Sequence, residues 1–228
     1  MTDPTGRPAA GGWDLSERRL YLCTPNRDDL EEFIDACIVG GVDVVQLRDK
    51  HLSDPDLIAR GRVAQQVCAG HRVPFILNDR PDLAVAVGAD GVHVGQDDTP
   101  ARAARALIGN HRLLGLSTHV RAELTTAVDQ QLPVDYVSAG PVHATPTKPG
   151  RPGTGLDYIR EAVSLSPWPV WITGGVDPDT VGEMIGAGAR HFVVVRWLTD
   201  AVDPAGHARQ LRQAIDRGIS DAVAPTPG

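Results

Sequence analysis

Residues 43–50 of the 228-residue chain read Asp-Val-Val-Gln-Leu-Arg-Asp-Lys, an apolar run that alternates with polar side chains and ends on charges. Strand interiors rarely carry this much polarity unless the polar side chains face one another or a ligand. The chain has 22 Lys and Arg residues, but only Lys50 and Lys148 are lysines, and both follow strand-like runs. Because an ammonium and a guanidinium contact phosphate differently, this use of lysine indicates an anion site. Two surface lysines placed by chance are the alternative.

The run after Asp43 is one of eight short β-branched runs, each followed by a polar or glycine-containing loop and a helical pattern. The runs are Leu20–Cys23, Val42–Leu47, Pro74–Leu77, Gly91–Val94, Leu113–Leu116, Tyr136–Ala139, Val170–Thr173 and Phe192–Val195. The helical segments are Asp28–Val39, Asp54–Ala69, Pro81–Val87, Pro100–Ile108, Ala122–Gln131, Leu156–Leu165, Pro178–Gly186 and Pro204–Arg217. This alternation predicts an α/β protein whose parallel sheet closes into a single-domain (β/α)8 TIM barrel. An open doubly wound sheet is the alternative, but no Gly-x-Gly-x-x-Gly follows the first run.

The two ends of the chain differ in composition from this repeating part. Residues 1–18 and 219–228 are rich in Gly, Pro and Ala, and we expect both to be flexible tails. The predicted barrel therefore spans residues 19–218. Within it, several helical segments end on a Gly-Ala-Asp or Gly-Val-Asp phrase, and glycine there suits the left-handed turn from a helix into the next strand.

The composition limits the partners of the protein. A hydrophobic content of 42%, a charged content of 22% and a net charge of −7 are those of a soluble globular protein without a general nucleic-acid surface. No apolar run is long enough for a membrane span or a signal peptide. Cys23, Cys37 and Cys68 lack metal-ligand spacing, and we expect them to be buried thiols of a cytoplasmic protein. Small-molecule substrates are the expected partners, with a homo-oligomer left open.

Polar residues gather after the apolar runs, where the carboxyl ends of barrel strands bind ligands. They are Arg48, Lys50, Asn78, Asp79, Gly95 to Asp98, Ser117 to His119, Gly140 to Lys148, Thr173 to Gly175 and Arg196. Asp79 and Asp98 follow neighbouring strands, and two carboxylates beside basic groups suit a Mg²⁺ ion that bridges a diphosphate. The alternative is that both aspartates are N-caps of the following helices, and for Asp98 alone this explanation is as good as the metal site. Asp97 is a near-equal alternative to Asp98.

Two further loops are candidates for anion binding. Residues 141–155 form the longest predicted loop and contain Lys148, which is typical of a lid or binding loop, although a solvated linker has the same composition. Gly174 and Gly175 open a helical segment and suit close approach of a phosphate, or a plain turn. Among the histidines, His93 alternates with buried valines and is expected in the barrel interior. His119 is an acid-base candidate that lacks an obvious carboxylate partner, and His191 is expected at the surface or an edge.

Five segments in this order resemble the thiamine-phosphate synthase family. They are Gln46-Leu47-Arg48-Asp49-Lys50, Asn78-Asp79, Gly91 to Asp98, Thr145-Pro146-Thr147-Lys148 and Gly174-Gly175. The resemblance runs from about Leu20 to Trp197. It implies that a hydroxymethylpyrimidine diphosphate condenses with a thiazole phosphate, or its carboxylated form, to give thiamine phosphate and pyrophosphate, with Mg²⁺ as cofactor.

The same resemblance implies a role for each matching residue. The pyrimidine diphosphate is assigned to Gln46, Arg48, Lys50, Asn78, Ser117 and Lys148, and the metal to Asp79 and Asp98. The thiazole phosphate is assigned to Thr145, Thr147, Gly175 and the backbone of Val195 and Arg196. Leu47, Asp49 and Pro146, which lie within the two motifs, complete the predicted substrate-binding set, and Arg48, Lys50, Ser117 and Lys148 are the predicted catalytic residues.

One position departs from the family pattern, because Arg196 stands where a small serine is common. Two other functions are considered: a thiazole phosphate tautomerase with His119 as the acid-base group, and a non-catalytic phosphate-binding barrel. A tautomerase has no use for the set formed by Arg48, Lys50, Asp79 and Asp98, and this argues for the synthase.

Overall fold

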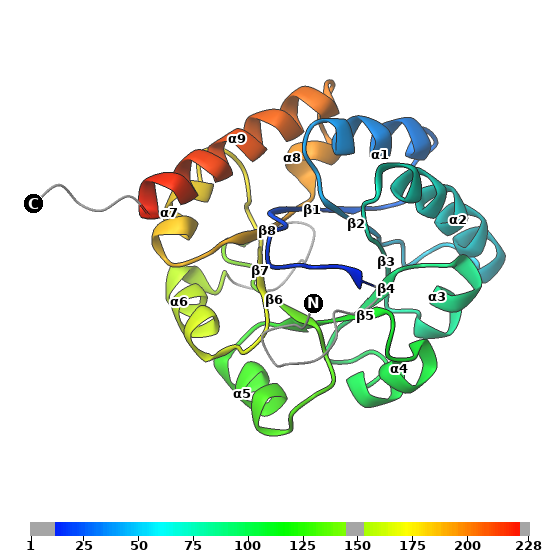
Figure 1. The fold of residues 1–228 in the computed structure, drawn as a ribbon, viewed down its shortest axis with the longest axis horizontal. Coiled ribbons are helices and arrows are strands. Elements are labelled where there is room, and N and C mark those ends of the chain that lie inside the picture. Colours follow the sequence, from blue (N-terminus) through cyan, green and yellow to red (C-terminus); the bar gives the residue numbers. More distant parts are fainter. Residues whose placement is uncertain (1–11, 145–152, 224–228) are drawn as a thin grey trace, which may run out of the picture.

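The structure, a computed structural model, describes residues 12–144 and 153–223. Eight parallel strands pair in chain order and close between β8 and β1, which confirms the predicted barrel (Figure 1). The strands are β1 (Leu20–Thr24), β2 (Val44–Leu47), β3 (Phe75–Asn78), β4 (Gly91–Val94), β5 (Leu113–Thr118), β6 (Tyr136–Ala139), β7 (Val170–Thr173) and β8 (His191–Val194).

Helices surround this barrel on the outside (Figure 1). They are α1 (Leu30–Val39), α2 (Asp54–His71), α3 (Pro81–Val87), α4 (Ala101–Ile108), α5 (Arg121–Asp129), α6 (Gly155–Leu165), α7 (Val181–Gly186), α8 (Arg196–Thr199) and α9 (Pro204–Val223). The short helix α8 was not predicted, because four residues carry no detectable periodicity. Helix α9 continues past residue 218, where we placed the start of a tail, and Ile219 packs against the core. Among the described residues, no helix combines the length and the apolarity needed to cross a membrane.

The side chains of the strands divide into two sets because successive residues of a strand point to opposite faces. Outward side chains such as Leu22, Val45 and Leu77 pack against the helices in the main core. Inward side chains form a second apolar cluster at the amino ends of the strands: Leu15, Tyr21, Val44, Ile76, Leu113, Tyr136 and Trp171. Nearer the carboxyl ends, the inward positions turn polar. The barrel is therefore closed at one end and polar at the other.

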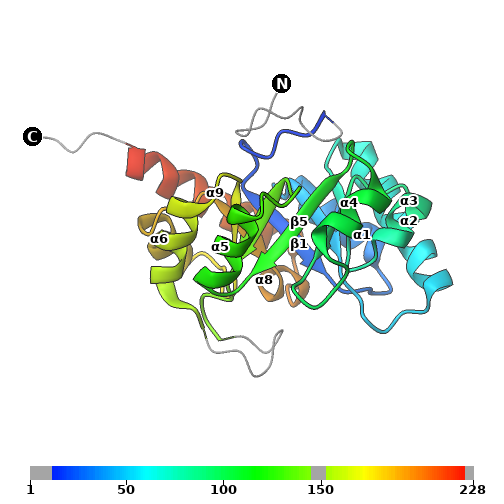
Figure 2. The ribbon, with the colours of Figure 1, turned by 90° about the horizontal axis from the view of Figure 1, so that it is seen from below.

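Residues 13–18 close the apolar end of the barrel and are not the flexible tail that we predicted. Leu15 is 6% exposed and belongs to the inner cluster. The Trp13 indole donates to Asp90 at 3.1 Å. Figure 2 shows this segment at one end of the barrel and α8 at the other. The Gly and Pro content of residues 1–18 concealed the two apolar side chains that fix residues 13–18 in place.

The aspartates of the repeated Gly-Ala-Asp and Val-Asp phrases hold neighbouring strands together at this closed end. Asp43, Asp90 and Asp135 precede β2, β4 and β6, and their carboxylates accept the backbone N–H of Leu20, Phe75 and Leu114. Each of these aspartates also donates its own N–H to the carbonyl of the same partner residue. This repeated pair of hydrogen bonds fixes where the backbone hydrogen-bond ladder begins between β1 and β2, between β3 and β4, and between β5 and β6.

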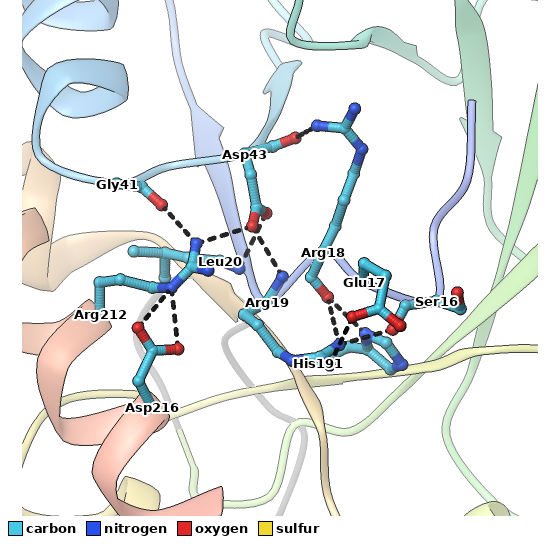
Figure 3. Close-up of polar contacts among 10 residues, drawn as sticks. All are labelled: Ser16, Glu17, Arg18, Arg19, Leu20, Gly41, Asp43, His191, Arg212 and Asp216. Carbon is cyan, nitrogen blue, oxygen red and sulfur yellow. Dashed lines mark hydrogen bonds and ion pairs between the residues drawn. The ribbon is translucent and has the colours of Figure 1, made fainter. Parts of the chain in front are cut away.

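Figure 3 shows how Asp43 also joins the barrel to its last helix and to the N-terminal segment. Its carboxylate lies 2.9 Å from Arg212 of α9, and its backbone carbonyl accepts from Arg18 at 2.6 Å. Burial raises the pKa of Asp43, while the backbone N–H of Arg19 and the Arg212 guanidinium act in the opposite direction.

His191, which we expected at the surface or an edge, lies in the same region at the start of β8 and is half-buried. Its Nδ1–H donates to the Arg18 carbonyl at 2.6 Å, and its ring lies 5.1 Å from that of Trp171. Burial lowers the pKa of His191 to about 4, so the imidazole is neutral in the folded protein.

Candidate active site

A cavity of about 350 Å³ opens at the carboxyl ends of the strands. Seven of the predicted site residues line it: Gln46, Arg48, Asn78, Ser117, Gly175, Val195 and Arg196. Gln46, Asn78 and Ser117 come from β2, β3 and β5, and Arg48 directly follows β2; period-two alternation turns these side chains inward. The Gln46 amide donates to the Asn78 side chain at 3.3 Å, which ties two neighbouring strands together at the floor of the cavity.

The two arginines that line the cavity are free to bind an anion. Neither the Arg48 nor the Arg196 guanidinium forms an ion pair or a side-chain hydrogen bond with another residue in the part of the chain that the structure describes. By contrast, Arg80 and Arg105, on the outside of the barrel, bind carboxylates at 2.5 and 2.6 Å. Guanidinium groups that have no carboxylate partner among the described residues concentrate positive charge beside the cavity in a protein of net charge −7.

Lys50, Asp79 and Asp98 form a cluster beside the cavity rather than in its lining. The Lys50 ammonium lies 2.9 Å from the Asp79 carboxylate. Burial raises the pKa of Asp79; Lys50 lowers it, and a hydrogen bond with Asp98 together with its charge raises it further. Asp98, and not Asp97, is thus the carboxylate next to Asp79. Its Oδ2 also accepts the Gly95 N–H at 2.8 Å, which holds the loop after β4.

These carboxylates are not helix caps. Helix α3 is preceded by Arg80 and α4 by Pro100, and no side chain caps either helix. Asp79 has a backbone φ of 59°, a left-handed conformation that is uncommon for residues other than glycine and recurs at functional sites. Its N–H donates to the His93 carbonyl at 2.8 Å, which stabilises this turn.

The pair fits a hard divalent cation. Repulsion between two neighbouring carboxylates raises the pKa of one of them, and a cation that lies between the two offsets this repulsion. No group of three or more metal-binding side chains occurs in residues 12–144 and 153–223. An ion held by Asp79 and Asp98 would therefore take its remaining ligands from water or from substrate oxygens, as Mg²⁺ commonly does.

Two residues of the 43–50 stretch have other roles. Leu47 is fully buried in the outer core, because it alternates with Gln46 and Arg48 and so faces the helices. The Asp49 carboxylate accepts the backbone N–H of Asn26, His51 and Leu52, and it shapes the loop that carries Lys50. Neither side chain lines the cavity.

Gly174 and Gly175 lack side chains and so leave room for the loop that follows β6 at the edge of the cavity. They have φ angles of 96° and 76°, and helix α7 begins only at Val181, so they do not open a helix as we predicted. A Cβ on Gly174 would lie 2.6 Å from the Cα of Pro141, and one on Gly175 would lie 2.7 Å from the His143 ring. Four predicted residues, Thr145, Pro146, Thr147 and Lys148, lie outside the described residues.

The histidines fall into different environments. His93 is buried inside the barrel as predicted, and it lines the cavity. His119 does have a carboxylate partner, since its Nδ1 lies 3.0 Å from Glu123 Oε2 one helical turn further on. We missed this pair because the i, i+4 spacing crosses the start of α5. His119 does not line the cavity.

Several residues that line the cavity are not among the predicted site residues. Tyr21, Cys23, Ser138 and Val193 all line the cavity from inward positions of β1, β6 and β8. Extending the period-two alternation back from the polar strand ends would have identified them.

The chain resembles known proteins along most of its length. A model of the thiamine monophosphate synthase family matches residues 20–198. A thiamine-phosphate synthase of Thermobifida fusca is 47% identical over 88% of this chain and 94% of its own length. A thiamine-phosphate synthase of Mycolicibacterium smegmatis is 42% identical over 88% of this chain and 93% of its own length.

Solved structures agree with these sequence matches. A thiamine phosphate pyrophosphorylase from Pyrococcus furiosus superposes with a TM-score of 0.79 at 26% identity, covering 88% of this chain and 96% of its own. A 3-hexulose-6-phosphate synthase, at 21% identity with a TM-score of 0.63 over 86% of this chain and 99% of its own, shares the fold. The matches by sequence cover more than two thirds of the chain. The chain belongs to the thiamine monophosphate synthase family.

Proposed function

We propose that this chain condenses 4-amino-2-methyl-5-(diphosphooxymethyl)pyrimidine with thiazole phosphate, or its carboxylated form, to give thiamine phosphate and pyrophosphate. Family membership supports the activity, as do the relatives named thiamine-phosphate synthase. The observation that carries the site assignment is the gathering of Arg48, Lys50, Asp79 and Asp98 at neighbouring strand ends beside one cavity. We propose a cytoplasmic location, which the burial of Cys23, Cys37 and Cys68 supports.

The proposed reaction breaks the bond between the pyrimidine methylene carbon and the diphosphate oxygen. The electron pair leaves with pyrophosphate, and the aminopyrimidine ring stabilises the resulting benzyl-like cation. The thiazole nitrogen then donates its lone pair to the methylene carbon and becomes cationic, so the protein supplies no nucleophile. Positive charge at the leaving group and a held geometry are therefore what the site must provide.

Arg48, Lys50 and Lys148 are assigned to the charge that develops on pyrophosphate. Arg48 is suited to this because its guanidinium has no competing carboxylate among the described residues. Lys50 reaches the same region on a flexible stem, with its side chain 52% exposed and its ammonium held near Asp79. Gln46, Asn78 and Ser117 are assigned to the polar groups of the pyrimidine diphosphate on the cavity wall.

Asp79 and Asp98 are assigned to a Mg²⁺ ion. When bound, this ion would supply further positive charge to the diphosphate oxygens of the leaving group. The Asp79 carboxylate, whose pKa is raised by burial and by Asp98, would be fully ionised once a cation offsets that repulsion.

The opposite rim of the cavity, formed by Gly175, Val195 and Arg196, is assigned to the thiazole phosphate together with Thr145 and Thr147. Arg196 departs from the small residue common in the family, yet it begins α8 and lines the cavity. We propose that its guanidinium binds this second phosphate directly.

The test is incubation with both substrates in the presence and absence of Mg²⁺, with release of pyrophosphate as the readout. Lys50→Met and Asp79→Asn are expected to reduce the rate strongly, whereas Arg121→Met, on the exposed surface, should not. Absence of pyrophosphate release would exclude the synthase. Turnover of the thiazole phosphate alone would favour the tautomerase, and binding of the pyrimidine diphosphate without turnover would favour a non-catalytic barrel.

A further inference from the structure

We propose that Tyr21, Tyr136 and His93 form a buried hydrogen-bond relay that presents the Ser117 hydroxyl to the cavity as a hydrogen-bond donor. Tyr136 and His93 are then positioning residues that act on substrate through Ser117. This inference deepens the proposed function and rests on it only for the identity of the substrate, because the relay itself can be measured without turnover.

The relay runs continuously from the closed end of the barrel to the cavity. The Tyr21 and Tyr136 hydroxyls lie 3.1 Å apart, and Tyr136 Oη lies 3.2 Å from His93 Nδ1. The other ring nitrogen, His93 Nε2, lies 2.9 Å from Ser117 Oγ, while Ser138 Oγ is more distant at 3.5 Å. These side chains come from four strands, β1, β6, β4 and β5, and all point into the barrel interior.

The direction of the hydrogen bonds follows from the buried end of the relay. Tyr21 is 2% exposed, and within the described part of the chain its hydroxyl has Tyr136 as its only hydrogen-bond partner. A buried hydroxyl proton is nearly always donated, so Tyr21 donates to Tyr136. Burial raises the pKa of both tyrosines, which keeps both hydroxyls protonated. Tyr136 then has its own proton left for His93 Nδ1.

The protonation of His93 follows from this direction. A neutral imidazole whose Nδ1 accepts a hydrogen bond carries its proton on Nε2. Nε2–H therefore donates to Ser117 Oγ, and the Ser117 proton is left to point elsewhere. Ser117 lines the cavity, where a phosphate or pyrimidine acceptor would receive that proton. In the reverse direction, Ser117 would donate to His93, and the Tyr21 proton would have no acceptor among the described residues.

A glycine makes room for the relay. Strand register pairs Gly115 with His93 on one side and with Tyr136 on the other. A Cβ at Gly115 would lie 2.2 Å from the Tyr136 ring carbon that carries the hydroxyl and 2.4 Å from His93 Nδ1. Gly115 does not have a positive φ, so its backbone conformation does not require a glycine. The lack of space for a side chain explains why a glycine stands here. The sequence thus leaves a gap at the position where Tyr136 meets His93.

The direct test is the tautomer of His93 in the full chain without substrates, measured by long-range ¹H–¹⁵N spectra of protein labelled at histidine. The signal is assigned by its loss in a His93→Asn variant. We expect the Nε2–H tautomer in the wild type and a mixture of tautomers in Tyr136→Phe. Tyr21→Phe, which removes the terminal donor but keeps the bond between Tyr136 and His93, should also give a mixture. An Nδ1–H tautomer in the wild type, or a Tyr136→Phe spectrum that matches the wild type, would overturn the relay.

Kinetics then test whether the relay acts through Ser117. Tyr136→Phe is expected to lower kcat by about tenfold, which is the rate change expected when one hydrogen bond is lost in the transition state. Tyr158→Phe is the matched control, since it removes a buried hydroxyl that donates to Thr118 and lies outside the relay. In a variant that already carries Ser117→Ala, adding Tyr136→Phe should not lower kcat any further. If the double variant loses kcat by the product of the two single-variant effects, the role of the relay through Ser117 is refuted. A wild-type chain without synthase activity would refute the proposed function and would leave the tautomer result intact.

Discussion

His191 provides a test of how the closed end of the barrel stabilises the fold. The side chain lies at the start of β8, where its Nδ1–H donates to the Arg18 carbonyl (Figure 3). Its ring packs on that of Trp171. Burial lowers its pKa from 6.5 to about 4, and the charges of Arg19 and Arg190 contribute to the shift. Because the folded pKa lies below the unfolded value, the unfolded chain binds more protons between these two pH values. The free energy of unfolding should therefore fall as the pH drops from about 6.5 towards 4.

The size of this effect follows from the two pKa values. With pKa values of 6.5 unfolded and about 4 folded, linkage gives a loss of about 2.5 kcal/mol at pH 4.5 relative to neutral pH. Other groups titrate in the same range, so the contribution of His191 is isolated by comparison with a variant. His191→Asn keeps a side-chain N–H near the position of Nδ1 and removes the titration.

The assay is urea denaturation of both proteins at pH 7 and at pH 4.5. The stability difference between the two pH values should be about 2.5 kcal/mol smaller in His191→Asn than in the wild type. Lost packing on Trp171 lowers the stability of the variant at both pH values and cancels in this comparison. His71→Asn, at an exposed ion pair with Asp35, serves as a control. An equal pH dependence in the wild type and His191→Asn would refute the burial argument.

Three further changes have defined expectations. Asp135→Asn removes the charged partner of Arg105, whose side chain is 7% exposed, and it should lower the free energy of unfolding by about 3 kcal/mol in urea denaturation; a change below about 1 kcal/mol would contradict a buried ion pair. Asp98→Asn removes one carboxylate of the proposed metal pair, so the Mg²⁺ concentration for half-maximal pyrophosphate release should rise by at least about tenfold, and an unchanged Mg²⁺ titration would exclude Asp98 as a ligand. Trp13→Ala removes the hydrogen bond to Asp90 at the end of the barrel opposite the cavity; it should cost about 1–2 kcal/mol of stability with kcat unchanged, and a change in kcat would show that the two ends are coupled.

Local patterns were sufficient to predict the barrel and much of the cavity wall. The strands Gly91–Val94, Tyr136–Ala139 and Val170–Thr173 match the predicted runs residue for residue. Arg48 and Ser117 were placed at strand ends beside the ligand site, and both line the cavity. These predictions succeeded because alternation along a strand and the position of its end are properties of a few consecutive residues.

Helix starts and short elements were predicted less well. Helix α7 begins at Val181, three residues after the predicted start at Pro178. Helix α2 begins at Asp54 as predicted, and Ser53 caps it by accepting the Asp56 N–H with its hydroxyl. The sequence around residue 53 contains several residues that can cap a helix, and the choice depends on where the preceding loop directs the chain.

What the sequence by itself determined is the strand-helix alternation and the set of polar residues carried to one end of the barrel. Only the tertiary structure decided which of them meet, as when Lys50 approaches Asp79 or Tyr136 reaches His93 through the space beside Gly115. It also decided that residues 13–18 close the opposite end. The physical reason is that barrel closure and strand register bring together residues far apart in the chain, and neither is encoded in the short-range pattern of any one segment.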